Sequence, residues 1–178
     1  MKPNKIAVIG NACSGKTRLS HALAEIHQLP LTHVDAVQFL AGMRLRDPAE
    51  TREILKDVSN NDKWIIDGFG PLKIIEDRFQ KADVVIFIQF PLWRNYWWCF
   101  KRQVKGFYSR RLELPAGCFE STIPHTIKLM KTIWNVHFGM WPQLDRIFAQ
   151  EIYRKKIFYI RTLGDFNRIL SSGVVKQG

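Results

Sequence analysis

The chain is poor in cysteine and has no long uninterrupted hydrophobic run. Its three cysteines are irregularly spaced, which predicts neither a disulfide framework nor a zinc site; we expect reduced thiols and a cytoplasmic location. The short apolar run before Gly10 predicts no signal peptide. The apolar stretch 84–100 is broken by Pro91, Arg94 and Asn95, so it falls short of the roughly 20 residues that a membrane-spanning helix needs.

Acidic residues are also scarce. The chain has 16 aspartates and glutamates against 27 lysines and arginines, a formal net charge of +11. Part of this excess is local, because residues 84–112 contain six basic side chains and no acidic one. Such a segment attracts polyanions, and nucleotide phosphates, nucleic acid or anionic lipid would all satisfy it. The tryptophans of this segment, Trp93, Trp97 and Trp98, leave peripheral membrane attachment open beside a packed helix.

The order of apolar segments predicts a single α/β domain over residues 1–178. Each predicted strand is a near-continuous apolar run, as expected for a parallel sheet that is covered on both faces. The intervening segments are long enough for right-handed helical crossovers, which indicates a doubly wound sandwich. The five predicted strands are Lys5–Ile9, Leu31–Asp35, Lys63–Asp67, Asp83–Phe90 and Lys156–Arg161.

The segment 101–124 interrupts this alternation. It is basic and contains glycine and proline, which favours a lid that excludes water and carries cations over a phosphate site. Residues 123–148 resume a helical pattern, with Trp134, Phe138 and Trp141 as expected packing residues. A short final helix is predicted over residues 165–170.

The most informative motif is Gly10–Thr17, which fits the phosphate-binding pattern G-x-x-x-x-G-K-[ST] at every fixed position. A predicted strand precedes it and a predicted helix follows it, as the mechanism of such a loop requires. Backbone N–H groups and the helix dipole can hold phosphates, and Lys16 can reach the β- and γ-phosphates. The predicted nucleotide-binding residues are Gly10, Cys13, Ser14, Gly15, Lys16, Thr17 and Arg18.

Two aspartates end predicted strands at the edge where ligands of open α/β sheets bind. Asp67 follows an apolar strand, the pattern expected of the acid that holds Mg²⁺ together with the Thr17 hydroxyl. Asp35 could orient a hydroxyl acceptor and take its proton. For both, the alternative is a turn or solvated aspartate. His33 lies on the same predicted strand as Asp35, and we expect it to be a packing residue and not a catalytic one.

Further candidate residues belong to the segments expected to bind the acceptor and to the predicted lid. Phe39 and Arg78 belong to the segments expected to form the acceptor pocket, although a surface position for Arg78 is an equal alternative. In the lid, Arg102, Arg110 and Arg111 could stabilise charge on the transferring phosphoryl group. A solvated basic face is the alternative for this group of arginines.

Six segments occur in one order and at characteristic intervals: Gly10–Thr17, Thr32–Ala36, Trp64–Gly68, Ala82–Phe87, Phe90–Arg94 and Gly117–Glu120. Together they resemble the adenylate-kinase-related P-loop proteins often labelled topology modulation proteins. The resemblance spans about Lys5 to Arg161 and implies a P-loop NTPase three-layer sandwich. It further implies five parallel strands in the order 2-3-1-4-5, a mobile helical lid that carries arginines, and Mg-ATP as donor.

Together these observations predict a Mg-ATP-dependent kinase that transfers the γ-phosphoryl group to a small molecule, with a hydroxyl acceptor slightly favoured. Adenylate kinases resemble Asp-Gly-Phe-Pro-Arg after the third strand, whereas this chain reads Asp-Gly-Phe-Gly-Pro at 67–71. This departure counts against adenylate kinase activity, so a nucleoside monophosphate kinase is the alternative function and not the favoured one. No Asn-Lys-x-Asp occurs, which disfavours a GTPase. An ATP-binding, nucleic-acid-associated regulatory protein is the alternative of another class.

Overall fold

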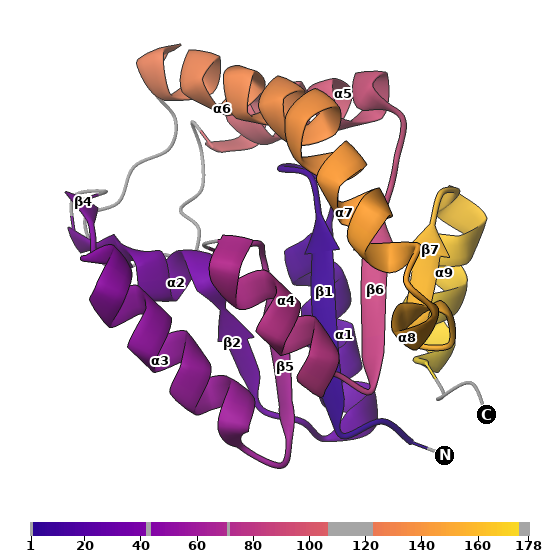
Figure 1. Cartoon of the computed structure of the whole chain (residues 1–178). Coiled ribbons are helices and arrows are strands. Elements are labelled where there is room, and N and C mark those ends of the chain that lie inside the picture. The colour runs from indigo at the N-terminus through magenta and orange to yellow at the C-terminus, as the bar shows by residue number, and fades with distance from the viewer. Residues whose placement is uncertain (1, 42–43, 71, 107–122, 175–178) are drawn as a thin grey trace.

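A five-stranded parallel sheet organises the chain (Figure 1). The computed structural model describes residues 2–41, 44–70, 72–106 and 123–174. In chain order the elements are β1 Lys5–Gly10, α1 Lys16–His27, β2 Leu31–His33, α2 Val34–Gln38, β3 Phe39–Leu40, β4 Arg44–Leu45, α3 Pro48–Asn60, β5 Trp64–Asp67, α4 Leu72–Lys81, β6 Val84–Ile88, α5 Leu92–Gly106, α6 Ile123–Asn135, the π-helical η2 Val136–Met140, α7 Trp141–Phe148, α8 Glu151–Arg154, β7 Ile157–Ile160 and α9 Leu163–Ser172.

The strands lie in the order β2-β5-β1-β6-β7. Counted along the chain, this is 2-3-1-4-5, the order that the family resemblance implies. The central strand β1 pairs in parallel with β5 on one side and β6 on the other. All carboxyl ends therefore meet at one edge, where the loop after Gly10 and the end of β5 at Asp67 lie next to each other. A small antiparallel hairpin, β3–β4, follows α2.

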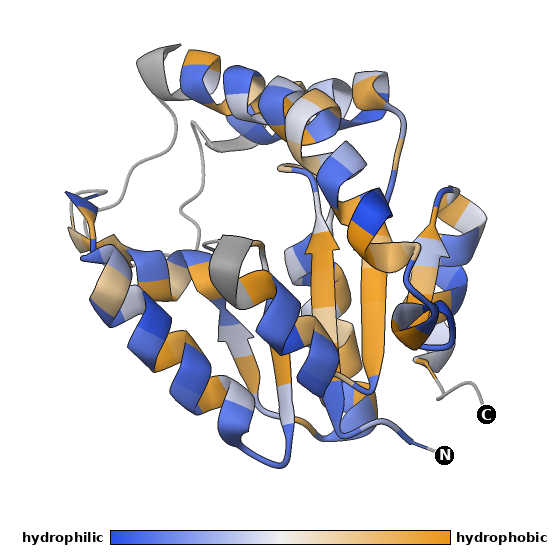
Figure 2. Cartoon of the chain, viewed as in Figure 1, coloured by the Kyte–Doolittle hydropathy of each residue, from blue (hydrophilic) through white to orange (hydrophobic). Residues whose placement is uncertain are grey.

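Two hydrophobic layers cover the sheet, because alternate residues of each strand face opposite sides. On β1, Ala7 and Ile9 face the cluster that includes side chains of α3, α4 and α7. Ile6 and Val8 face the cluster built on α1 and α9. Figure 2 shows β1 and β6 as almost wholly hydrophobic, with more hydrophilic helices outside. The predicted three-layer α/β sandwich is confirmed.

One predicted strand ends earlier than expected. We expected Leu31–Asp35 to be extended, but β2 stops at His33 and Asp35 lies in the first turn of α2. In the sheet, β2 pairs with β5 alone, and this ladder ends where His33 meets Asp67, the last residue of β5. Without further ladder bonds the backbone turns into a helix. The placement of Asp35 at a strand end was therefore wrong.

The region from α5 to α7 is helical as predicted, but its packing differs. Trp141 is buried, whereas Trp134 and Phe138 are each 53% exposed, so two of the three expected packing residues were assigned wrongly. Residues 101–106 continue α5 and residues 123–124 begin α6. The remainder of the predicted lid, with Arg110 and Arg111, lies outside the described residues. No helix in the described segments is long and apolar enough to cross a membrane.

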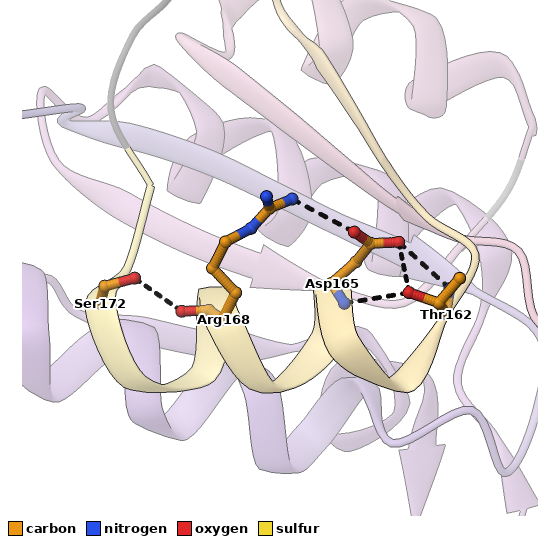
Figure 3. Close-up of polar contacts among 4 residues, drawn as sticks. All are labelled: Thr162, Asp165, Arg168 and Ser172. Carbon is orange, nitrogen blue, oxygen red and sulfur yellow. Dashed lines mark hydrogen bonds and ion pairs between the residues drawn. The ribbon is translucent and has the colours of Figure 1, made fainter.

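Helix α9 packs against the phosphate-binding loop through Phe166. Its start is held by side-chain hydrogen bonds (Figure 3). The Thr162 hydroxyl accepts a hydrogen bond from Asp165 N at 3.1 Å, and the Asp165 carboxylate accepts one from Thr162 N at 3.2 Å. This reciprocal arrangement satisfies N–H groups at the helix start. Arg168 pairs with Asp165 one turn later. The cap fixes the helix that carries the buried Phe166.

Replacement of the capping threonine should destabilise the whole domain, because α9 packs on both α1 and β7. We expect Thr162→Ala to lower the free energy of unfolding by about 1 kcal/mol. Urea denaturation followed by circular dichroism measures this loss. Thr162→Ser keeps the hydroxyl and should unfold nearly like the wild type. Equal stability of the alanine and serine variants would contradict the capping role.

Candidate active site

The loop between β1 and α1 is shaped by a glycine immediately before the helix. Gly15 has φ +84°, a left-handed conformation that side-chain-bearing residues rarely adopt. A Cβ at this position would also lie 3.1 Å from Cζ of Phe166. The sequence thus turns sharply into α1 only because residue 15 has no side chain. The N–H groups in the first turn of α1 then point toward the loop, as phosphate binding requires.

Asn11 holds this loop in place, a role that the sequence motif did not reveal. The side chain is fully buried. Its Oδ1 accepts a hydrogen bond from Ala12 N, and its Nδ2 donates one to the carbonyl of Ile133 on α6, both at 2.8 Å. The motif leaves this position open, so only the packing of α6 over the loop identifies it. Asn11 therefore connects the phosphate-binding loop to the helices above it.

The Lys16 side chain interacts with most of the other predicted site residues. Its Nζ donates a hydrogen bond to the Asn11 carbonyl at 2.7 Å, across the loop. Burial of the ammonium lowers the pKa of Lys16, while the carboxylates of Asp35 and Asp67 act in the opposite direction. Cys13 and Arg102 also interact with it electrostatically, Cys13 raising and Arg102 lowering its pKa. Predicted residues from three elements and one loop thus act electrostatically on a single cation.

Asp67 lies at the carboxyl edge of the sheet, and only one of its two carboxylate oxygens has a polar partner among the described residues. The residue is 5% exposed. Its Oδ1 is 2.9 Å from Nδ1 of His33, and its buried Oδ2 has no hydrogen-bond partner among the described residues. A buried carboxylate oxygen without a partner is costly unless a ligand satisfies it. His33, expected to be a packing residue, therefore contacts the candidate metal ligand directly.

Arg78 is buried on α4 and not a surface side chain. Its Nη2 donates hydrogen bonds to the carbonyls of Gly68 and Phe69 at 2.8 and 3.1 Å, and thereby holds the turn after β5. Burial lowers the pKa of Arg78 to about 10, while Asp67 acts to raise it. Phe39, the other predicted acceptor residue, is half-buried at the start of the β3–β4 hairpin.

The residues present fit Mg-ATP. Ser14 Oγ is buried in the loop without a hydrogen-bond partner among the described residues, and Thr17 lies in the first turn of α1. That turn contains no acidic side chain that would repel phosphate. No group of three or more His, Cys, Asp and Glu side chains that could hold a metal occurs in the described segments. A site of one hydroxyl and one carboxylate suits Mg²⁺, which keeps water and phosphate ligands.

The remaining predicted residues lie in different places. Gly10 closes β1, and a Cβ there would lie 2.9 Å from that of Ile88, so glycine permits the close approach to β6. Arg18 is exposed on α1, away from the buried part of the loop. Arg102 lies on α5 within electrostatic reach of Lys16. Arg110 and Arg111 lie outside the described residues.

Comparison with solved structures identifies proteins of similar fold. A gluconokinase from Sinorhizobium meliloti 1021 is 15% identical, covers 97% of this chain and 91% of its own, and has a TM-score of 0.58. A shikimate kinase from Bacteroides thetaiotaomicron is 16% identical over 96% of this chain and 94% of its own, with a TM-score of 0.54. A shikimate kinase from Acinetobacter baumannii, solved with shikimate, is 13% identical over 97% and 96%, with a TM-score of 0.52.

No protein-family model and no curated protein sequence matches the chain. The structural likeness extends over nearly the full length of each chain, but the identities are low. It therefore shows the fold and leaves the reaction to be argued from the site. The chain has the P-loop kinase fold.

The conformation of Gly15 gives a direct test of the loop. Gly15→Ala should lower the affinity for Mg-ATP at least about tenfold and the free energy of unfolding by more than about 1 kcal/mol, because the positive φ and the Phe166 ring both oppose a Cβ. Titration calorimetry and urea denaturation measure the two effects. Gly139→Ala, where a Cβ meets nothing within 4 Å, is the matched control. Unchanged nucleotide binding by Gly15→Ala would show that the loop does not need this conformation.

Proposed function

We propose that the protein is a Mg-ATP-dependent kinase that transfers the γ-phosphoryl group to a hydroxyl of a small molecule. The observation that carries this proposal is the position of Lys16, held across the phosphate-binding loop and within electrostatic reach of the carboxylates of Asp35 and Asp67. One cation for phosphate, one buried carboxylate for metal and one exposed carboxylate for an acceptor are the groups that phosphoryl transfer requires.

The nucleotide side of the site would rest on the loop and the start of α1. Backbone N–H groups from Gly10 to Thr17 would bind the phosphates, and Lys16 would neutralise the β- and γ-phosphates. Thr17 and Asp67 would hold Mg²⁺, which when bound neutralises charge on the phosphates. Arg102 on α5, which acts electrostatically on Lys16, would add a further cation. Arg110 and Arg111 are proposed to join it.

The acceptor side would rest on α2 and the β3–β4 hairpin. Asp35 is exposed in the first turn of α2. An ionised carboxylate can orient a hydroxyl and accept its proton, whereas a phosphate monoester is largely ionised at pH 7 and needs no base. Phe39 would pack against the acceptor. Arg78 would act through the turn 68–69 that it holds.

The structural neighbours support the same choice. Gluconokinase and shikimate kinase are small-molecule hydroxyl-acceptor kinases, and both share the fold over nearly the whole chain. A nucleoside monophosphate kinase is the alternative within this class. The narrower resemblance to topology modulation proteins, a cytoplasmic location and association with nucleic acid stay predictions from the sequence.

An acceptor panel tests the proposal. Purified protein with Mg-ATP is supplied with small hydroxylated metabolites, nucleosides or nucleoside monophosphates, and ADP formation is measured. We expect stimulation by a hydroxyl compound, loss of turnover in Lys16→Ala, and a fall in kcat of about a hundredfold or more in Asp35→Asn, because the amide cannot accept the proton. Stimulation by monophosphates alone would contradict the hydroxyl acceptor and the role of Asp35. ATP binding without any stimulation would contradict a kinase.

The contact between His33 and Asp67 gives a second test. We expect His33→Ala to raise the Mg²⁺ concentration needed for half-maximal activity about tenfold, since the groups that orient a metal ligand affect metal affinity by this order. His33→Asn can still present an N–H donor and should restore part of this affinity. A Mg²⁺ requirement that is the same in the alanine variant and the wild type would show that His33 does not position Asp67.

A further inference from the structure

Helices α5 and α6 and the segment η2 carry large hydrophobic side chains that face solvent. On α5 the exposed residues recur at helical spacing, and each is between 49% and 63% exposed. The corresponding residues of α6 and η2 are between 36% and 53% exposed. We call these eight side chains the α5–α6 apolar surface: Trp93, Trp97, Phe100 and Val104, with Ile127, Met130, Trp134 and Phe138.

The two helices lie side by side at the end of the molecule near the carboxyl edge of the sheet (Figure 1). The Tyr96 hydroxyl donates a hydrogen bond to the Met130 carbonyl at 3.4 Å and joins them. The opposite sides of both helices are occupied, because Asn95 and Cys99 of α5 and Ile133 of α6 are fully buried. The exposed rows are therefore additional to the faces that pack on the domain.

The charges around this surface have one sign. Helices α5 and α6 contain six lysines and arginines, and neither they nor η2 contain an aspartate or glutamate. Lys101, Lys128 and Lys131 are exposed. Two cations lie over exposed rings: Lys101 Nζ is 5.0 Å from the centre of the Trp97 ring, and Arg94 Cζ is 5.2 Å from that of Trp93.

We propose that the α5–α6 apolar surface binds the surface of a bilayer that contains anionic lipids. Contiguous apolar patches rimmed by charge mark interaction sites, because their exposure to water is unfavourable. Tryptophan and aliphatic side chains enter the boundary between headgroups and acyl chains, and neighbouring lysines attract anionic headgroups. The binding is peripheral, with both helices parallel to the membrane plane. This inference does not depend on the proposed kinase activity.

The same observations argue against two other occupants. A second copy of the chain would bring the exposed lysines Lys101, Lys128 and Lys131 of each copy together without a carboxylate from these helices, which electrostatic repulsion opposes. Single-stranded nucleic acid stacks its bases on aromatic rings, but Val104, Ile127 and Met130 provide none. The rings also pack on each other, with centroids 6.1 Å apart for Trp97 and Phe100 and 4.3 Å apart for Trp134 and Phe138.

Sedimentation with sucrose-loaded vesicles tests this proposal on the full chain. We expect binding to vesicles of phosphatidylcholine mixed with phosphatidylglycerol, little binding to phosphatidylcholine alone, and release by high salt. Trp97→Gln with Phe100→Gln should weaken binding about tenfold or more, because apolar contacts with the acyl chains are lost. Lys128→Gln with Lys131→Gln should also weaken binding about tenfold. These residues are exposed, so circular dichroism should show both variants folded.

Two control variants match these changes elsewhere on the surface. Ile152→Gln with Leu163→Gln removes apolar side chains that are 56% and 43% exposed, and Arg52→Gln with Lys56→Gln removes two exposed cations of α3. Both should bind vesicles like the wild type. Equal binding by test and control variants would overturn the proposal, as would absence of vesicle binding. Binding of single-stranded DNA alone, or a dimer that Trp97→Gln with Phe100→Gln dissociates, would replace it with another occupant.

Discussion

The candidate site depends on the placement of one ammonium group, that of Lys16, in surroundings largely shielded from solvent. Burial lowers the pKa of Lys16, and the carboxylates of Asp35 and Asp67 oppose this effect and favour its charged form. The loop backbone contributes as well, since the Asn11 carbonyl accepts a hydrogen bond from Nζ. The fold supplies each of these groups from a different element at the carboxyl edge. Phosphate oxygens would add negative charge at the same place, so a bound nucleotide and the charged lysine favour each other.

Two helices support the loop in this arrangement. The capped helix α9 places Phe166 against Gly15, where the absence of a Cβ lets the chain turn into α1. Asn11 of the loop is hydrogen-bonded to α6. Phosphate binding needs backbone N–H groups in fixed directions, and a loop held at two points loses less conformational freedom when the ligand binds. Two helices far along the chain, α6 and α9, thus contribute to one short motif near its start.

The sequence was most informative where local pattern and fold agree. The phosphate-binding motif and the five strands of the sheet were identified from spacing and composition, because a covered parallel sheet leaves near-continuous apolar runs. The boundary after His33 could not be found, since it depends on where the neighbouring strand β5 ends. Asn11 and His33 were missed as site residues because each acts through a partner far along the chain, Ile133 and Asp67 respectively. Burial of Arg78 likewise follows from a turn that only the folded chain presents.

The tryptophans show why helical spacing alone cannot assign a core. Trp134, Phe138 and Trp141 occur at intervals that suit one face, yet only Trp141 is buried. The helix is π-helical from Val136 to Met140, and the extra residue per turn rotates the following residues relative to those before it. The change in winding directs Trp141 toward the sheet while Trp134 and Phe138 stay outside. The π-helical segment thus changes which face of the helix is buried: Ile133 and Val136 are buried before Trp141 is, whereas Trp134 and Phe138 face solvent.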